Sequence, residues 1–299
     1  MFTECIKEGF RLTHRNWQLI IVRLAISFIN LISLGFFLVI PVIVAIFYLG
    51  FDLAHAKDIP YYIMNNPMEY ASRYIGLIFL IFAAIIMYLV FSSFLLLYIL
   101  SGTLGVLKSS AVDEGYRFRL SLFFKEAGKN FAGLFWLISS LMAGFMVIMI
   151  LFAFIGGAGW TVTRSIGDTG MAVEVFLKYF ITSAYFIFGI IFLFATLVLA
   201  AFSITVSVVE GSGTMESIKR AYYFLIGRPG AFIFYMILLA VLLFTNFVFV
   251  SFSIIPFISP LINVVLQKYL TVVVWSSLIV YYMKNTDHLT PGKTHDIHG

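Results

Sequence analysis

Residues 207–239 read SVVEGSGTMESIKRAYYFLIGRPGAFIFYMILL, and this stretch shows how the whole chain is organised. A long apolar segment ends at the turn EGSG, residues 210–213. A short basic segment follows, in which Thr214 and Glu216 supply the small hydroxyl and the acid that favour a helix start. The chain breaks again at GRPG, residues 227–230, where glycines supply backbone freedom, before a new apolar segment begins. The pattern predicts a surface helix between two membrane spans.

The same pattern recurs twice in weaker form. Basic segments at residues 6–17 (IKEGFRLTHRNW) and 124–131 (FKEAGKNF) each precede an apolar run, and the middle copy is about one helical turn shorter. We therefore predict one six-helix membrane domain over residues 1–284 with a polar tail at 285–299. Its three repeats cover about 1–110, 111–210 and 211–284, each a surface helix followed by a hydrophobic hairpin.

Composition places the chain among membrane proteins. Hydrophobic residues make up 62% of the sequence and charged residues only 11%, whereas soluble domains are about half apolar and a quarter charged. The single cysteine, Cys5, excludes an internal disulfide and a cysteine-based metal site. The first apolar run starts near Leu19 and continues for some thirty residues, so no cleavable signal peptide is expected.

Six stretches are apolar and long enough to cross a bilayer core, which needs about 20 residues. We place them at 19–49, 74–107, 131–155, 176–209, 231–252 and 261–283. The second and fourth exceed the minimum by more than ten residues and must tilt or project beyond the core. Pro41 lies late in the first span and is expected to kink or end it. The fold class is therefore all-α, with six transmembrane helices as three hairpins joined by cytoplasmic amphipathic connector helices.

The basic residues predict the orientation of the spans. Most of the 19 Lys and Arg residues fall at the two ends or in the second and fourth connections, and these are Lys7, Arg11, Arg15, Arg23, Lys108, Arg117, Arg119, Lys125, Lys129, Lys219, Arg220, Arg228, Lys284 and Lys293. The opposite side holds Lys57, Arg73, Arg164 and Lys178. By the positive-inside rule both termini are cytoplasmic.

Ionisable groups within spans are functional candidates, because burying a charge in lipid is costly. Lys268 lies about seven residues into the sixth span, beside Tyr269. Either it contacts an ion, a lipid headgroup or a partner's carboxylate, or it snorkels to the outer interface, which is the reading we favour. No Asp or Glu lies deep in a span, whereas a proton-coupled transporter usually needs such a group. Hydrogen bonds between helices are expected to account for deep polar residues such as Asn30, Asn246 and Thr196.

Enzymatic function has no positive support in the sequence. There is no nucleophile elbow, P-loop or H-E-x-x-H motif. His295, Asp296 and His298 share the tail, but no ligand set converges on a rigid element, so no metal and no cofactor is expected.

The basic connectors are the most informative polar feature. In the first, Phe2, Ile6 and Phe10 recur every four residues, which is typical of a helix lying in the headgroup plane with its apolar face down. Each Lys or Arg near an anionic leaflet adds about 1 kcal/mol of attraction. Such helices either bind lipid headgroups or a partner protein, or they only fix the orientation of the spans in the membrane. The candidate contact residues are Lys125, Lys129, Lys219, Arg220, Arg228 and Lys268.

Several motifs resemble those of a large prokaryotic family of six-helix membrane proteins. They are Val208-Val209-Glu210-Gly211-x-Gly213, Ser217-x-Lys219-Arg220-Ala221 with Gly227, Gly102-x-x-Gly105, Asp113-Glu114-Gly115, Ser121-Leu122-x-Phe124 and Val280-Tyr281-Tyr282-x-Lys284. The family includes the membrane domain attached to some glycerophosphoryl diester phosphodiesterases. The resemblance implies the fold over essentially the whole chain and a place in the prokaryotic cytoplasmic membrane. The 299 residues leave no room for the catalytic domain, so its activity is not expected here.

The sequence thus favours a non-catalytic membrane scaffold or partner subunit. Its cytoplasmic connectors would dock another protein or anionic lipid, and no nucleic acid is expected as a partner. The alternative is a transport role, as the permease-like subunit of a multi-component exporter or as a lipid-handling protein.

Overall fold

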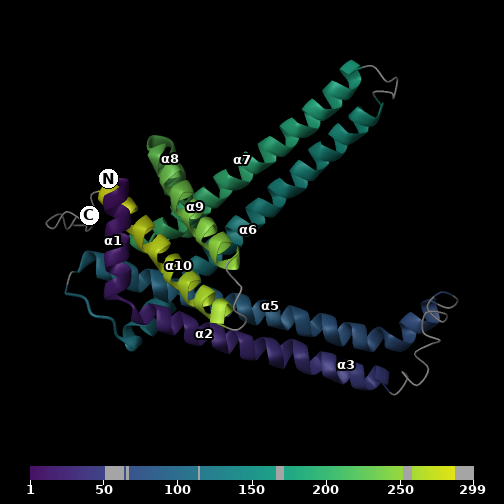
Figure 1. The fold of residues 1–299 in the computed structure, drawn as a ribbon, viewed down its shortest axis with the longest axis horizontal. Coiled ribbons are helices and arrows are strands. Elements are labelled where there is room, and N and C mark those ends of the chain that lie inside the picture. Colours follow the sequence, from purple (N-terminus) through teal and green to yellow (C-terminus); the bar gives the residue numbers. More distant parts are fainter. Residues whose placement is uncertain (51–63, 65–66, 114, 166–171, 252–257, 287–299) are drawn as a thin grey trace. The chain divides into compact units, whose positions relative to one another are not determined.

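The structure is a computed structural model that describes residues 1–50, 64, 67–113, 115–165, 172–251 and 258–286. The described chain is all-α (Figure 1), with no strand in these ranges. In chain order the elements are α1 (Phe2–Arg15), α2 (Gln18–Leu34), the π-helical turn η1 (Gly35–Val39), α3 (Ile40–Gly50), α5 (Pro67–Val112), α6 (Leu120–Ser165), α7 (Ala172–Glu210), α8 (Thr214–Gly227), α9 (Gly230–Ser251) and α10 (Ile258–Asn285).

Six helical segments of the described chain are long and apolar enough to cross a membrane. They are Gln18–Phe47, Ile75–Val112, Leu120–Gly157, Tyr179–Glu210, Gly230–Val248 and Ile262–Asn285. Each overlaps one of the six predicted spans, and the third begins eleven residues before its predicted start at residue 131. The prediction of an all-α polytopic membrane protein is therefore confirmed.

Contacts within the chain form two compact units. The larger unit combines Met1–Trp17 with Ser101–Gly299, and the smaller unit is Gln18–Leu100. The predicted single domain, its three repeats and its tail stay predictions. The tail residues after Thr286, and Lys57 and Asp168 in the outer connections, lie outside the described residues. The side chains of Arg73, Arg164 and Lys178 are likewise not described.

The smaller unit holds the first span, in which the predicted irregularity at Pro41 is present. Pro41 has no backbone N–H, so the carbonyl of Phe37 loses its usual partner four residues on. The turn immediately before it, Gly35–Val39, is π-helical, a wider turn that accommodates this loss. The helix nevertheless continues to Gly50. Pro41 thus distorts the span without ending it, and the Phe37 ring packs 5.7 Å from that of Phe91 on α5.

In the larger unit, α6 and α7 run side by side as a long hairpin (Figure 1). Glycine permits their close approach, because a Cβ on Gly156 would lie 2.5 Å from the Tyr185 hydroxyl oxygen. That hydroxyl donates to the carbonyl of Phe152 over 2.7 Å. Large apolar side chains are exposed along both helices, over residues 136–155 of α6 and 176–197 of α7. These faces suit contact with lipid tails.

The other ends of the long helices are buried against one another, and we call this part of the larger unit the buried end. It comprises α1, α8, residues 101–112 of α5, 120–137 of α6, 198–210 of α7, 230–238 of α9 and 272–285 of α10. Fully buried side chains include Leu104, Phe123, Leu137, Phe202, Phe234 and Ile279. With 46 residues, α6 is ~69 Å long, more than twice the ~30 Å hydrocarbon core. One side of this extra helix length, with Phe123, Ala127, Leu134 and Leu137, is buried in protein.

The N-terminal helix α1 packs against α10 through a face of small residues. Cys5, Gly9, Leu12 and Thr13 are buried, and a Cβ on Gly9 would lie 2.1 Å from the Ser277 hydroxyl oxygen. The hydroxyls of Thr13 and Ser276 are 3.1 Å apart and hydrogen-bonded.

The sequence predicts that Phe2, Ile6 and Phe10 form the face of α1 turned toward the membrane, and this stays a prediction. It did not indicate the face of small residues that packs on α10. Phe2 and Phe10 lie at the edges of the contact, with ring centroids 5.9 Å from Tyr281 and 6.1 Å from Tyr269, respectively. Glycine and threonine carry little hydropathy, so the pattern of large apolar residues did not indicate the face where the backbones approach most closely.

The middle connector is not a separate surface helix. Residues 124–131 lie in the first turns of α6, which continues without a break into the third span. Lys, Glu and Ala are good helix formers, and no proline interrupts them, so the helix propagates through the polar segment.

Candidate contact surface

The turn that follows α7 is held by one carboxylate. Gly211 has φ of 67°, the left-handed conformation that glycine adopts without strain, and it reverses the chain into α8. The Glu210 carboxylate accepts hydrogen bonds from the Arg220 guanidinium and the Tyr282 hydroxyl. It thereby joins the end of α7 to α8 and α10.

Arg220, a predicted contact residue, is engaged in this internal network. Its guanidinium also pairs with Glu216, one turn back on α8. The hydrogen bonds to Glu210 and then to Glu216 raise the pKa of Arg220 above its usual value. With two carboxylates beside it, Arg220 offers no net positive charge to a partner.

Arg228, also a predicted contact residue, is part of an internal contact as well. It donates to the side-chain oxygen of Asn285, the last residue of α10, and its guanidinium lies 5.7 Å from the centroid of the Phe224 ring. These contacts fix the break between α8 and α9 against the end of α10. The side chain remains exposed at its surface.

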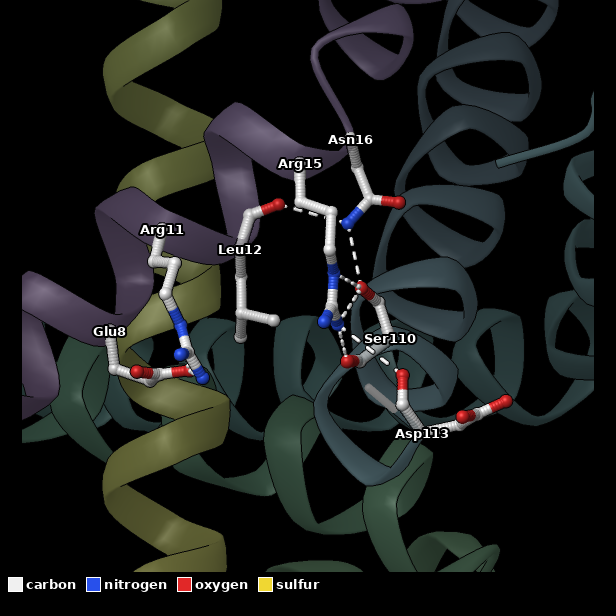
Figure 2. A network of polar contacts seen from close by, with 7 residues as sticks. All are labelled: Glu8, Arg11, Leu12, Arg15, Asn16, Ser110 and Asp113. Atoms are coloured by element: carbon white, nitrogen blue, oxygen red, sulfur yellow. Dashed lines mark hydrogen bonds and ion pairs between the residues drawn. The ribbon is translucent and has the colours of Figure 1, made fainter. Parts of the chain in front are cut away.

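Two further cations cap helix C-termini, where unsatisfied carbonyls concentrate negative partial charge. Arg15 donates to the carbonyls of Ser110 and Asp113 at the end of α5, and to the Ser110 hydroxyl (Figure 2). Asn16 donates to that hydroxyl over 2.7 Å. The Lys108 ammonium donates over 3.0 Å to the carbonyl of Val208 in the last turn of α7. These basic residues therefore hold the buried end together.

The motif Gly102-x-x-Gly105 allows α5 to approach the start of α6. A Cβ on Gly102 would lie 2.7 Å from the ring of Phe123, and one on Gly105 would lie 2.7 Å from the Cβ of Glu126. Phe123 is fully buried by this contact. The start of α6 is consequently fixed on α5, and this orients the side chains on its outer face.

That outer face carries Lys125 and Lys129, both exposed, together with the exposed side chain of Phe124. Arg117 and Arg119, also exposed, precede the helix. No ion pair to these four cations is found among the described residues. Glu126, the acid between the two lysines, is half-buried and turned toward Gly105 of α5. We call Arg117, Arg119, Phe124, Lys125 and Lys129 the α6 basic surface.

Lys219 lies on the outer face of α8, beside an open groove of about 740 Å³. Leu199 of α7 forms one side of the groove, and Met215, Ile218, Tyr222 and Tyr223 of α8 form the other. The two tyrosines are 52% and 61% exposed. Lys219 has no carboxylate partner among the described residues, so its charge differs from that of Arg220. The sequence did not indicate this groove, because it depends on how α8 folds back along α7.

Lys268 is half-buried on α10, and its neighbour Tyr269 contacts Phe10. Snorkelling of Lys268 stays a prediction. Of the deep polar residues, Asn246 is bonded between helices as predicted, accepting from Gln267 over 2.6 Å. Thr196 instead donates to its own helix, at the carbonyl of Phe192. Asn30 keeps a buried amide oxygen with no hydrogen-bond partner in the described chain.

Cys5 is fully buried, and burial raises the pKa of its thiol above the ordinary value. A protonated, buried thiol is a poor nucleophile at neutral pH. Over the described residues, no three His, Cys, Asp or Glu side chains come together as metal ligands would. His295, Asp296 and His298 lie outside the described residues.

Comparison with known proteins finds no match to this chain among family models, curated proteins or solved structures. The resemblance to the six-helix family related to phosphodiesterase membrane domains therefore stays a prediction. What the fold and the surface define is a class, an all-α multi-pass membrane protein with a tightly packed end that carries exposed basic residues.

Proposed function

We propose that this chain is a non-catalytic membrane scaffold or partner subunit that binds an acidic surface of another protein through the α6 basic surface. The observation that carries the proposal is the exposure of Lys125 and Lys129 beside Phe124 on a rigidly held helix start, with the exposed Arg117 and Arg119 just before it. Aromatic residues and Arg are enriched at protein interfaces, and clustered positive charges complement an acidic partner surface. A rigid surface loses little entropy on binding, which favours affinity.

The proposal places the buried end in the cytoplasm, with both termini on that side of a prokaryotic cell membrane. The distribution of Lys and Arg supports this orientation through the positive-inside rule. Because Cys5 is buried, it is a poor reporter of orientation. A Cys5→Ala background with Lys125→Cys gives an exposed thiol instead. An impermeant maleimide should label it only after the cytoplasmic face is opened, and labelling in intact cells would reverse the orientation.

The docking surface is tested by charge reversal in the full-length chain. We expect a protein that co-purifies stoichiometrically with the wild type from native membranes, and that is lost from the Lys125→Glu/Lys129→Glu double variant. Quantitative mass spectrometry of the purified complexes measures both. Arg220 is unsuitable for this test, because its reversal would also disrupt the internal network around Glu210.

The matched control is Lys219→Glu, a single exposed lysine on α8 outside the α6 basic surface. It should keep the partner protein, since it leaves Lys125 and Lys129 unchanged. If the double variant retains every component found with the wild type, the docking proposal is wrong. The transport alternative makes a different prediction, namely that the purified chain alone moves a solute across liposomes.

A further inference from the structure

The groove between α7 and α8 joins apolar walls to one cation. Its walls are Leu199, Met215, Ile218 and the faces of Tyr222 and Tyr223, and its volume of about 740 Å³ lies in the range of small-molecule sites. Glu216 and Arg220 also border it, but they pair with each other, and Arg220 pairs with Glu210 besides. These three residues together carry one net negative charge, and Lys219 is the cation at the groove that pairs with no described carboxylate.

The position of the groove along α7 relates it to the lipid-facing surface. Phe188 lies eleven residues before Leu199, hence on the same side of α7, and is 63% exposed, whereas Phe202, three residues after Leu199, is buried. Leu199, which lines the groove, thus lies where the exposed apolar face of α7 ends. The groove is continuous with a surface that suits lipid tails.

The direction of α8 sets the order of its groups relative to that surface. Arg220 pairs with Glu210 at the end of α7, while Phe224 packs against Phe202 two turns earlier, with ring centroids 5.4 Å apart. α8 therefore runs back along α7 toward its lipid-facing part. Tyr222 and Tyr223 lie nearer that part, and Lys219 lies about one turn farther away.

We propose that this groove binds the headgroup of an anionic phospholipid, with Lys219 pairing with its phosphate. The two tyrosines then occupy the interfacial zone that amphipathic aromatic rings prefer. The upper part of an acyl chain lies against Leu199 and continues along the exposed face of α7. An ammonium is a compact charge that binds phosphate without demanding a fixed geometry, which suits a mobile lipid.

Lipid fits this site better than an acidic protein segment does, because the groove opens onto the face of α7 that contacts lipid tails. The site is separate from the α6 basic surface, so either proposal can fail while the other holds.

The test is a titration of the purified full-length chain in a neutral detergent, followed by native mass spectrometry. Phosphatidylglycerol is compared with phosphatidylcholine for the wild type and for Lys219→Gln, Lys219→Arg and Lys129→Gln. We expect phosphatidylglycerol to be preferred and its first binding step to weaken about fivefold in Lys219→Gln, since one Lys near an anionic headgroup contributes about 1 kcal/mol. Lys219→Arg should restore binding, and Lys129→Gln should leave it unchanged.

Competition arms separate the possible ligands. Glycerol 3-phosphate, which has the phosphate but no acyl chains, should not displace the lipid, and neither should a poly-glutamate peptide. Displacement by the first would make this a soluble-phosphate site, and displacement by the second would make it a protein-docking site. Equal weakening by Lys219→Gln and Lys129→Gln would indicate unspecific lipid contact. Each of these results overturns the proposal, as does unchanged binding in Lys219→Gln.

Discussion

α8 and the start of α6 share a sequence pattern but have different structures. Both are short basic segments before an apolar span, yet α8 is a separate helix that folds back on α7, whereas the start of α6 runs straight into its span. Two of the three cations of α8 and its following turn, Arg220 and Arg228, make internal contacts. Lys125 and Lys129 of α6 remain exposed.

The difference shows that the number of cations in a connector does not determine how many a partner can reach. A segment that folds back brings its side chains against neighbouring helix ends, where carboxylates and terminal carbonyls attract them. A segment that continues a span keeps one face outward along its whole length. Turn chemistry, through glycine and proline, decides between these two outcomes.

The network around Glu210 should be the most sensitive part of α8. Glu210→Ala removes the acceptor of Tyr282 and the main partner of Arg220. A hydrogen bond to a charged group contributes about 1.5–3 kcal/mol, so we expect a loss of roughly 2–3 kcal/mol in the free energy of unfolding. Urea unfolding of the purified protein in detergent, followed by tryptophan fluorescence, measures it.

The control for this change is Tyr282→Phe, which removes the hydroxyl but keeps the ring that packs 5.0 Å from Phe224. Glu210 then retains Arg220, so the loss should be smaller, about 1 kcal/mol. If Glu210→Ala unfolds at the wild-type urea concentration, α8 is not held by this carboxylate and its difference from α6 needs another cause.

The start of α6 should depend on close packing rather than on charge. In Gly102→Ala the new methyl would lie 2.7 Å from the ring of Phe123, which is fully buried. Overpacking of this kind costs about 1–3 kcal/mol, and we expect a net loss of roughly 1–2 kcal/mol. In Gly128→Ala, on the open face of α6, nothing lies within 4 Å of the new atom. That variant should gain roughly 0.5–1 kcal/mol from helix propensity. Equal effects at the two sites would mean that α5 does not hold the start of α6.

These comparisons also show what could be read from the sequence. The six spans were predictable, because long apolar runs separated by polar segments have one stable arrangement in a bilayer. The separate helix α8 was predictable as well, since glycines and Pro229 mark both of its ends. The continuous start of α6 was mispredicted, because polarity was interpreted as a helix boundary although no proline interrupts the helix and the single Gly128 is not enough to end it.

The sequence could not predict which cations are exposed to a partner and which are engaged in internal contacts. Arg220 meets Glu210 across a turn, Arg228 meets Asn285 from 57 positions away, and Arg15 meets Ser110 from 95 positions away. Such pairings follow from how helix ends pack, and no local pattern encodes them. The groove beside Lys219 was missed for the same reason.

The turn that separates α8 from α7 offers a smaller test. Gly211 has φ of 67° and open space around its Cα, so an added methyl meets only backbone strain. Gly211→Ala should cost about 1 kcal/mol or slightly more, the penalty of a left-handed conformation for an L-residue. Gly213, the N-cap of α8, has φ of −64° and open space around it, so Gly213→Ala meets no left-handed strain. It loses only the N-cap preference of glycine over alanine, and we expect a smaller loss than at Gly211. Urea unfolding of both variants measures the free energy of unfolding. An equal loss at Gly213 and Gly211 would show that the left-handed conformation at Gly211 has no special role in the turn.

The smallest effects should come from the cations themselves, and they distinguish the exposed ones from those in internal contacts. Lys125→Gln and Lys219→Gln remove charges with no ion-pair partner in the described chain, so the free energy of unfolding should change by less than about 0.5 kcal/mol. Arg228→Gln removes the contact with Asn285 and the stacking on Phe224, and an exposed cation–π contact contributes about 0.5–1 kcal/mol. In urea unfolding, Arg228→Gln should therefore be less stable than the two lysine variants. In binding assays, Lys125→Gln should weaken partner binding and Lys219→Gln should weaken lipid binding, each more than Arg228→Gln does. A lysine variant that unfolds more easily than Arg228→Gln would show that the lysine ammonium stabilises the fold. This result would argue against a binding site at the corresponding surface.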